Sequence, residues 1–178
     1  MYFIERTFTQ NHCYRDALSS RIVGRAERLI SQRGISVEVV NPPSSPSLIV
    51  TTHPSRWDAT FLRLIPNTFI VVNTDALRRT GVQRLDNFLG VSVARMIPVS
   101  PGDVSLNHRC YDIASSVIDD GFNVAIALPK HTGDIGVPLD REVCVGGTVS
   151  ILRRQPSVPL IPTVILLDKE LTPEETVY

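Results

Sequence analysis

The sequence lacks the features that mark several large classes of protein. It has only three cysteines, Cys13, Cys110 and Cys144, which are widely spaced and never form a C-x-x-C pair, so neither a disulfide framework nor a zinc site is expected. No apolar run reaches the roughly 18 to 20 residues that span a bilayer, and the first ten residues lack the apolar core of a signal peptide. These absences predict a cytoplasmic protein that would associate with a membrane only at its surface.

The chain also lacks an excess of charge of either sign, because 18 basic residues balance 18 acidic ones. A neutral chain gives no electrostatic reason to expect a nucleic acid as its partner. The sequence contains neither the G-x-S-x-G elbow of serine hydrolases nor a glycine-rich phosphate loop. We therefore expect no metal ion, no resident cofactor and no nucleic acid.

What is present is an ordinary globular composition, in which 43% of the 178 residues are hydrophobic and 20% are charged. That length suits one domain with a substantial core, so residues 1–178 are expected to form a single domain. Strands are predicted over residues 35–40, 47–52, 68–72, 91–99, 124–128 and 160–167, and helices over 15–33, 55–65, 105–120 and 146–154, with two short helical stretches in 75–89. This alternation predicts an α/β sandwich with a mixed, largely parallel sheet flanked by helices.

The segment 15–33 is expected to be a helix with a basic surface, since it carries five arginines among apolar residues at helical spacing. Gly34 follows it and is a typical helix stop. A basic helix can lie on an anionic membrane. It can equally pack on its own domain as an ordinary amphipathic helix, which is the interpretation that we favour.

The sequence TTHPSRWDATFL over residues 51–62 carries the strongest chemical signal. His53 stands on the turn after a predicted strand, and Asp58 follows five residues later in the first turn of a predicted helix. From that turn the imidazole can fold back over the helix start and reach the carboxylate. A carboxylate bonded to one ring nitrogen fixes the tautomer and leaves the other nitrogen as a base near neutral pH. The alternative is structural, because Ser55 and Asp58 also form a capping box.

Four segments in order resemble the motifs of the glycerol-3-phosphate and lysophosphatidate (1-acylglycerol-3-phosphate) acyltransferase superfamily. The segment HPSRWD at 53–58 matches its first motif, H-x-S-x-x-D, and MIPV at 96–99 resembles the second, G-x-I-P-V-D-R. The run DDGFNVAIALP at 119–129 resembles the approach to the third, F-P-E-G-T-R, and VPLIP at 158–162 is similar to the fourth, V-P-I-V-P. The resemblance extends over about residues 47–167, and the four blocks together favour a divergent member of the superfamily.

The resemblance implies an acyltransferase that moves a fatty acyl group from acyl-CoA or acyl carrier protein to the hydroxyl or amine of a lipid or small-molecule acceptor. His53 would be the general base and Asp58 would orient it, with no covalent acyl-enzyme and no metal required. Ser55, Lys130, His131 and Thr132 would lie in the acceptor and oxyanion region. Trp57 would line an acyl pocket, although a tryptophan in such a place also serves as a core or rim residue.

The second and third blocks depart from the family pattern at the residues expected to bind phosphate. The family's glutamate and glycine fall on Lys130 and His131, and its two arginines fall on Gly133 and Pro101. Neither glycine nor proline offers the planar fork of an arginine. Either Lys130 and His131, together with Arg95, form a different anion site, or the acceptor carries no phosphate. Lys130 and His131 can also belong to an ordinary solvated loop.

A second hypothesis is a non-catalytic relative that binds an acyl chain or a lipid and has lost the acceptor site. The altered third block favours this hypothesis, whereas the intact His53, Ser55 and Asp58 favour an enzyme. We expect an enzyme whose acceptor is not a standard glycerol phosphate.

Overall fold

A computed structural model of the chain describes residues 20–21, 24, 27–28, 30–51, 58–73, 95–100, 102–128 and 146–165. The elements in chain order are β1 (Leu48–Thr51), α3 (Asp58–Leu62), β2 (Thr68–Asn73), β3 (Met96–Val99), α6 (Val104–Asp119), β4 (Asn123–Ala127), α7 (Gly146–Arg154) and β5 (Leu160–Thr163). The strands form one sheet in the order β3-β2-β4-β1-β5. Every neighbouring pair in it is parallel. The predicted α/β fold is therefore confirmed, with a sheet whose described strands are all parallel.

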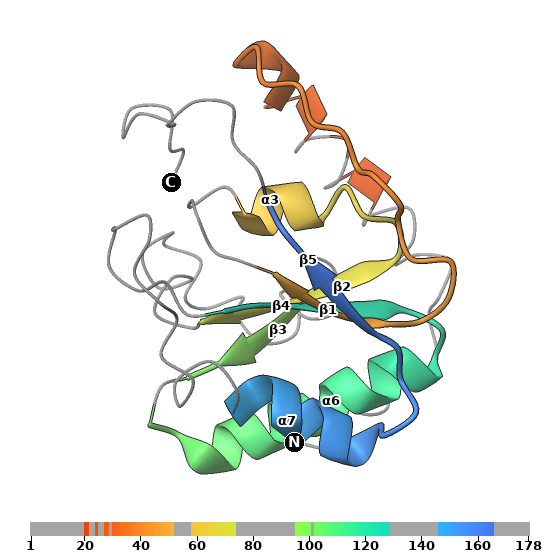
Figure 1. The fold of residues 1–178 in the computed structure, drawn as a ribbon. Helices are drawn as coiled ribbons and strands as arrows, with labels where there is room; N and C mark the ends of the chain where they lie inside the picture. The colour runs from red at the N-terminus through yellow and green to blue at the C-terminus, as the bar shows by residue number, and fades with distance from the viewer. Residues whose placement is uncertain are drawn as a thin grey trace, which may run out of the picture.

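Helices cover both faces of this sheet, with α3 on one face and α6 and α7 on the other (Figure 1). Strands β1 to β4 are short apolar runs that are largely buried, as parallel strands covered on both faces generally are, whereas β5 at the edge of the sheet is partly exposed. Successive residues of β1 show the burial on both faces: Leu48 packs toward α6 and α7, whereas Ile49 packs toward α3. None of the helices within the described ranges is both long and apolar enough to cross a bilayer.

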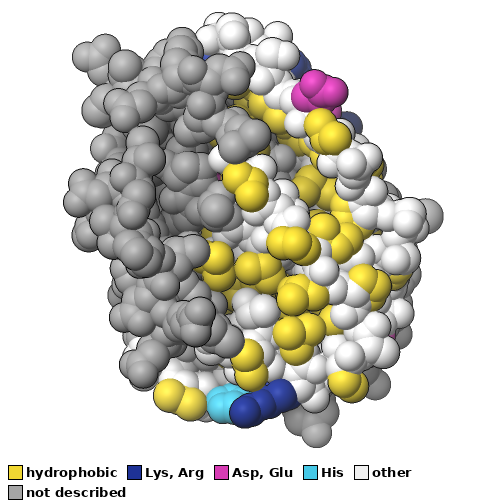
Figure 2. All heavy atoms as spheres, in the orientation of Figure 1, with side chains coloured by type: hydrophobic (Ala, Val, Ile, Leu, Met, Phe, Trp, Pro, Cys, Tyr) yellow, Lys and Arg dark blue, Asp and Glu magenta, His cyan; other side chains and the backbone are white. Residues whose placement is uncertain are grey.

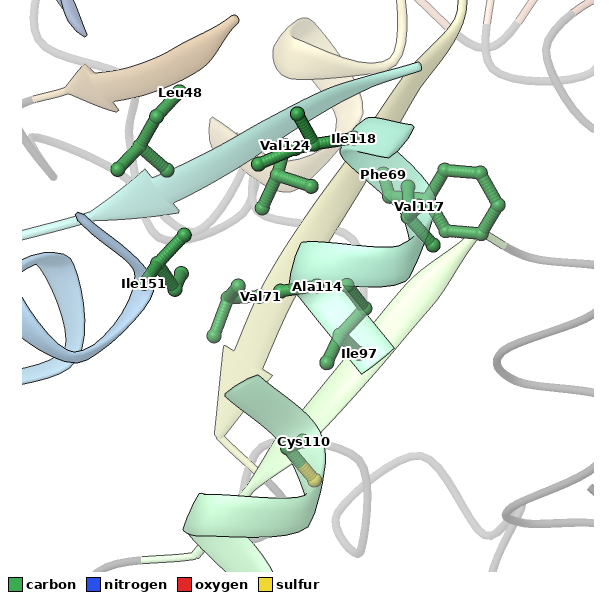
Figure 3. Close-up of a cluster of buried hydrophobic side chains, with 10 residues drawn as sticks. All are labelled: Leu48, Phe69, Val71, Ile97, Cys110, Ala114, Val117, Ile118, Val124 and Ile151. Atoms are coloured by element: carbon green, nitrogen blue, oxygen red, sulfur yellow. The ribbon is translucent and has the colours of Figure 1, made fainter. Parts of the chain in front are cut away.

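The larger core lies between the sheet and the two-helix layer (Figure 3). It consists of Leu48, Phe69, Val71, Ile97, Cys110, Ala114, Val117, Ile118, Val124 and Ile151. Cys110 is buried there, and burial raises the pKa of its thiol to about 11. The thiol therefore stays protonated at neutral pH and acts as a small apolar core group.

The smaller core lies on the α3 face and consists of Ile49, Leu62, Ile65, Ile70 and Ala125. The end of the basic N-terminal helix packs beside it, since Ile30 is buried in a cluster with Phe61 of α3. Residues 20, 21, 24, 27, 28 and 30–32 are helical, and Arg21 and Arg28 are exposed. This contact favours a helix whose C-terminal end packs on the domain.

Two helices end on a glycine in the left-handed conformation, as the sequence predicted. Gly34 has φ 66° and Gly121 has φ 91°. After Gly121, the N–H of Phe122 donates to the carbonyl of Val117 at 3.1 Å, and the N–H of Gly121 donates to that of Ile118 at 3.0 Å. This pair of bonds is a Schellman motif, which satisfies the last carbonyls of α6.

Replacing Gly121 by alanine is expected to lower the free energy of unfolding by about 1 to 2 kcal/mol, because a Cβ is strained at positive φ. Gly146→Ala is the matched control, since Gly146 opens α7 without positive φ and no atom lies within 4 Å of the place that a Cβ would take there. Urea unfolding of both variants measures the difference. Equal stability of the two variants would contradict the assignment of strain to Gly121.

The predicted strand at residues 35–40 is wrong, because these residues form no ladder in the structure. Their apolar side chains pack instead: Ile35 and Val37 lie against the Ile30 cluster, and Val39 lies against the α3-side core. The alternating pattern reported burial of one side of an extended segment, which does not require a neighbouring strand. The helix predicted to reach residue 65 ends at Leu62, and the strand predicted to reach residue 167 ends at Thr163. The helical stretches predicted in 75–89 lie outside the described residues.

Each edge strand of the described sheet carries a proline. Its backbone nitrogen, which has no hydrogen to donate, points away from the neighbouring described strand. In β5, the carbonyl of Pro159 accepts from Leu48 of β1 at 2.9 Å, so the next outward-facing positions are Leu160 and Pro162. In β3, the carbonyl of Arg95 accepts from Ile70 of β2 at 2.8 Å, which turns Pro98 outward in the same way. Proline at such positions discourages the addition of another strand.

Apolar side chains gather over the part of the surface around β5 (Figure 2). Leu160 is 50% exposed there, and Val164 lies just beyond the strand and is also exposed. The edge is apolar, but Pro162 limits its capacity for strand pairing.

Candidate functional site

The carboxyl ends of β1 and β4 lie side by side. Thr51 is in register with Ala127, and the N–H of Leu128 donates to the carbonyl of Thr51 at 2.9 Å. His53 is two residues beyond Thr51, and Lys130 is two residues beyond Leu128. The two segments that carry the first and third sequence motifs therefore leave the sheet from adjacent points, at the edge where open α/β sheets bind ligands.

Six of the predicted site residues lie outside the described residues. They are His53, Ser55, Trp57, Lys130, His131 and Thr132. The strands from which their segments emerge are described, and these fix the edge of the sheet at which each segment begins. Among the described residues, no group of three or more His, Cys, Asp and Glu side chains is arranged to hold a metal ion.

Asp58 is described, and it is almost completely buried, with 1% of its surface exposed. It opens α3, which connects the parallel strands β1 and β2 and therefore runs back across the sheet. Leu62 packs in the same cluster as Ile49. Asp58 lies four residues before Leu62, or roughly 6 Å along the helix axis. Thr51 lies two residues after Ile49, which is also roughly 6 Å along the strand. This register carries Asp58 toward the carboxyl edge of β1, the edge that His53 follows.

Thr51 adds a second buried polar group at this edge. Its side chain is 1% exposed, and its hydroxyl has no hydrogen-bond partner in the structure as described. Strand alternation turns Thr51 to the same face as Ile49, which is the α3 face. A buried hydroxyl and a buried carboxylate therefore share one face and one edge of the sheet, and polar groups in such places usually serve a specific purpose.

The loop after β3 is closed by side chains of α6. The N–H of Ser100 donates to the Asn107 side-chain carbonyl at 2.8 Å, and the Asn107 amide donates back to the Ser100 carbonyl at 2.9 Å. Asp103 caps α6 by accepting from the N–H of Leu106 at 2.9 Å. Both bonds to Asn107 use main-chain atoms of Ser100, so it is the Asn107 side chain that holds this residue against α6.

Arg95 lies at the opposite edge of the sheet from the segment that carries His53. It precedes β3, so it stands at the amino edge. Its guanidinium lies 5.9 Å from the ring centre of Phe69 and 5.4 Å from that of Phe122, and the two rings meet edge to face. The structure therefore does not bring Arg95 to the carboxyl edge, where a shared anion site with Lys130 and His131 was expected.

No motif in the sequence indicates an interaction partner for the His108 ring. In the structure this ring contacts Arg154 on the outer surface. The Nδ1 atom of His108 lies 3.2 Å from a guanidinium nitrogen of Arg154, and that guanidinium also pairs with Asp112. His108 and Asp112 are four residues apart on α6, and Arg154 is in the last turn of α7. The cluster ties the two helices together on the face opposite α3.

Comparison of the chain with protein-family models, with curated proteins and with solved structures gives no match. The resemblance to the acyltransferase superfamily therefore rests on the four sequence motifs themselves.

Proposed function

We propose that the protein is an acyltransferase that uses His53 as general base and Asp58 as the carboxylate that orients it. The observation that supports this proposal best is the junction of β1 and β4, where Leu128 bonds to Thr51 directly before the two motif segments. A reaction centre built from the ends of neighbouring parallel strands is common in α/β enzymes. The burial of Asp58 agrees with a carboxylate held in one orientation.

In the proposed reaction, His53 removes the proton from an acceptor hydroxyl or amine as the acceptor attacks the thioester carbonyl carbon. The new acyl–acceptor bond forms, the carbon–sulfur bond breaks, and the proton passes from His53 to the departing thiolate. Asp58 stabilises the imidazolium that exists between these two transfers. Donors near Thr132 stabilise the oxyanion. Acyl-CoA or acyl carrier protein supplies the acyl group, and the acceptor is a lipid reached at a membrane surface or a small molecule.

A non-catalytic relative that binds acyl chains is the second candidate. The replacement of the family's glutamate and glycine by Lys130 and His131 favours it. A thioester-release assay separates the two candidates, with a panel of acyl donors and of acceptors with and without phosphate. An enzyme releases thiol in proportion to the acceptor added. A binding protein retains the acyl thioester unchanged.

Glycerol-3-phosphate and lysophosphatidate are expected to be poor acceptors. The two arginines that the resemblance assigns to phosphate fall on Pro101 and Gly133. Each lost charge-assisted contact is worth about 1.5 to 3 kcal/mol, or at least tenfold in affinity. Steady-state kinetics should therefore show a higher kcat/KM for an acceptor without phosphate. Efficient acylation of glycerol-3-phosphate that is lost in Lys130→Ala would contradict this expectation and assign the phosphate to Lys130.

A further inference from the structure

Arg63 is a cation that lies outside the four sequence motifs. It follows α3 directly and lies five residues beyond Asp58. The side chain is half-buried, and its Nε atom is buried with no hydrogen-bond partner in the described structure. Burial lowers the pKa of the Arg63 guanidinium below its ordinary value. No carboxylate within the described ranges offsets this burial.

An arginine in this situation is unusual because a guanidinium cannot lose its charge in a protein. A buried charge is strongly unfavourable unless a counter-charge and hydrogen bonds compensate it. Arg154 shows the ordinary arrangement in the same chain, since its guanidinium pairs with Asp112 at the surface. Arg63 is partly buried, and its Nε–H group has no hydrogen-bond acceptor in the described structure.

Arg63 follows the end of α3 that is farther from the carboxyl edge of the sheet, because α3 begins at Asp58 and runs back across the sheet. Five residues correspond to roughly 7.5 Å along a helix axis. A group bound by the guanidinium would therefore lie within one substrate length of the proposed reaction centre.

We propose that Arg63 anchors an oxyanion-binding site that takes a phosphate group of a substrate. An oxyanion supplies the missing charge and the missing acceptor together, and the planar fork of arginine matches phosphate geometry. The assignment to a substrate rests on the proposed function, whereas the binding of the anion does not. The expected source is the acyl donor, because coenzyme A and acyl carrier protein both carry phosphate on the pantetheine arm.

Thermal unfolding in inorganic phosphate, against chloride at matched ionic strength, tests the site without any activity. Phosphate at ten times its Kd should raise the Tm of the wild-type chain by roughly 3 to 6 °C. Arg153→Met, which removes an exposed arginine of α7, should show the same rise. Arg63→Met should show none, and in chloride it should unfold no earlier than the wild type, because a partly buried cation with an unpaired donor is gone. Arg63→Lys, which keeps the charge without the fork, should respond more weakly than the wild type.

An equal phosphate response in Arg63→Met, or no response in the wild type, would overturn the site. Kinetics then identify the source of the phosphate. Arg63→Met should raise the KM of an acyl-CoA about 10- to 100-fold and leave that of the matching acyl-pantetheine, which has no phosphate, unchanged. If Arg63→Met raises only the KM of phosphorylated acceptors, the site binds the phosphate of the acceptor. If it raises the KM of neither donor nor acceptor, the assignment of the site to a substrate is refuted. If Arg63 binds phosphate but the protein turns over no thioester, the acyltransferase proposal is wrong and the anion site still stands.

Discussion

His53→Ala is expected to lower turnover of an acyl thioester by about 100- to 10,000-fold, the range that a positioned general base usually contributes. Without the imidazole, no side chain of the proposed site would take the proton from the attacking hydroxyl or amine, so that proton would have to pass to solvent. The KM for the donor should change little, because the imidazole acts on the reacting proton and not on the acyl chain. Thiol release under saturating donor measures the effect.

His108→Ala is the matched control for this variant. His108 is an exposed histidine on α6 whose ring contacts Arg154, on the face of the sheet opposite α3. It should retain wild-type turnover. Equal activity of the His53→Ala and wild-type proteins would show that another group is the base.

Asp58→Asn is expected to lower turnover by about 100- to 10,000-fold while the protein remains folded. An amide has nearly the shape of the carboxylate, but it cannot stabilise an imidazolium and can hold the wrong tautomer of His53. The structural alternative predicts a different result, because asparagine caps helices about as well as aspartate. Turnover and unfolding free energy, measured on the same preparation, separate the two.

Asp103→Asn provides the comparison for Asp58→Asn, since Asp103 is an N-cap whose carboxylate accepts from Leu106 at 2.9 Å. Its replacement should leave both turnover and stability close to those of the wild type. If Asp58→Asn behaves like Asp103→Asn, then Asp58 is a cap and the catalytic assignment fails.

The sequence predicted the elements that local chemistry determines strongly. The helix that ends before Gly121 is an example, because a left-handed glycine must follow its last turn. The apolar runs that became β1, β2 and β4 also carry their own signal, since strands buried on both faces contain almost no polar residues. Parallel pairing followed from the alternation of strands and helices.

Two predictions failed because a sequence pattern indicates which residues are buried, or where they stand in the chain, but does not identify the segments that they contact. Residues 35–40 alternate because one side of an extended segment packs on Ile30 and the α3-side core, and burial alone does not specify a ladder. Arg95 was grouped with Lys130 although it precedes a strand, and in a parallel sheet a residue before a strand lies at the amino edge. Chain direction was thus a usable signal. Arg63 carried no such signal, because its burial depends on tertiary packing.

The stoichiometry of acyl transfer tests the central proposal most directly. Purified protein is incubated with an acyl thioester and an acceptor, and mass spectrometry quantifies free thiol, acylated acceptor, free fatty acid and acylated protein. The proposed mechanism predicts one acylated acceptor for each thiol released, no acylated protein, and loss of both products in His53→Ala. Release of free fatty acid without acylated acceptor, a stable acyl-protein adduct, or tight binding of an unreacted thioester would contradict it.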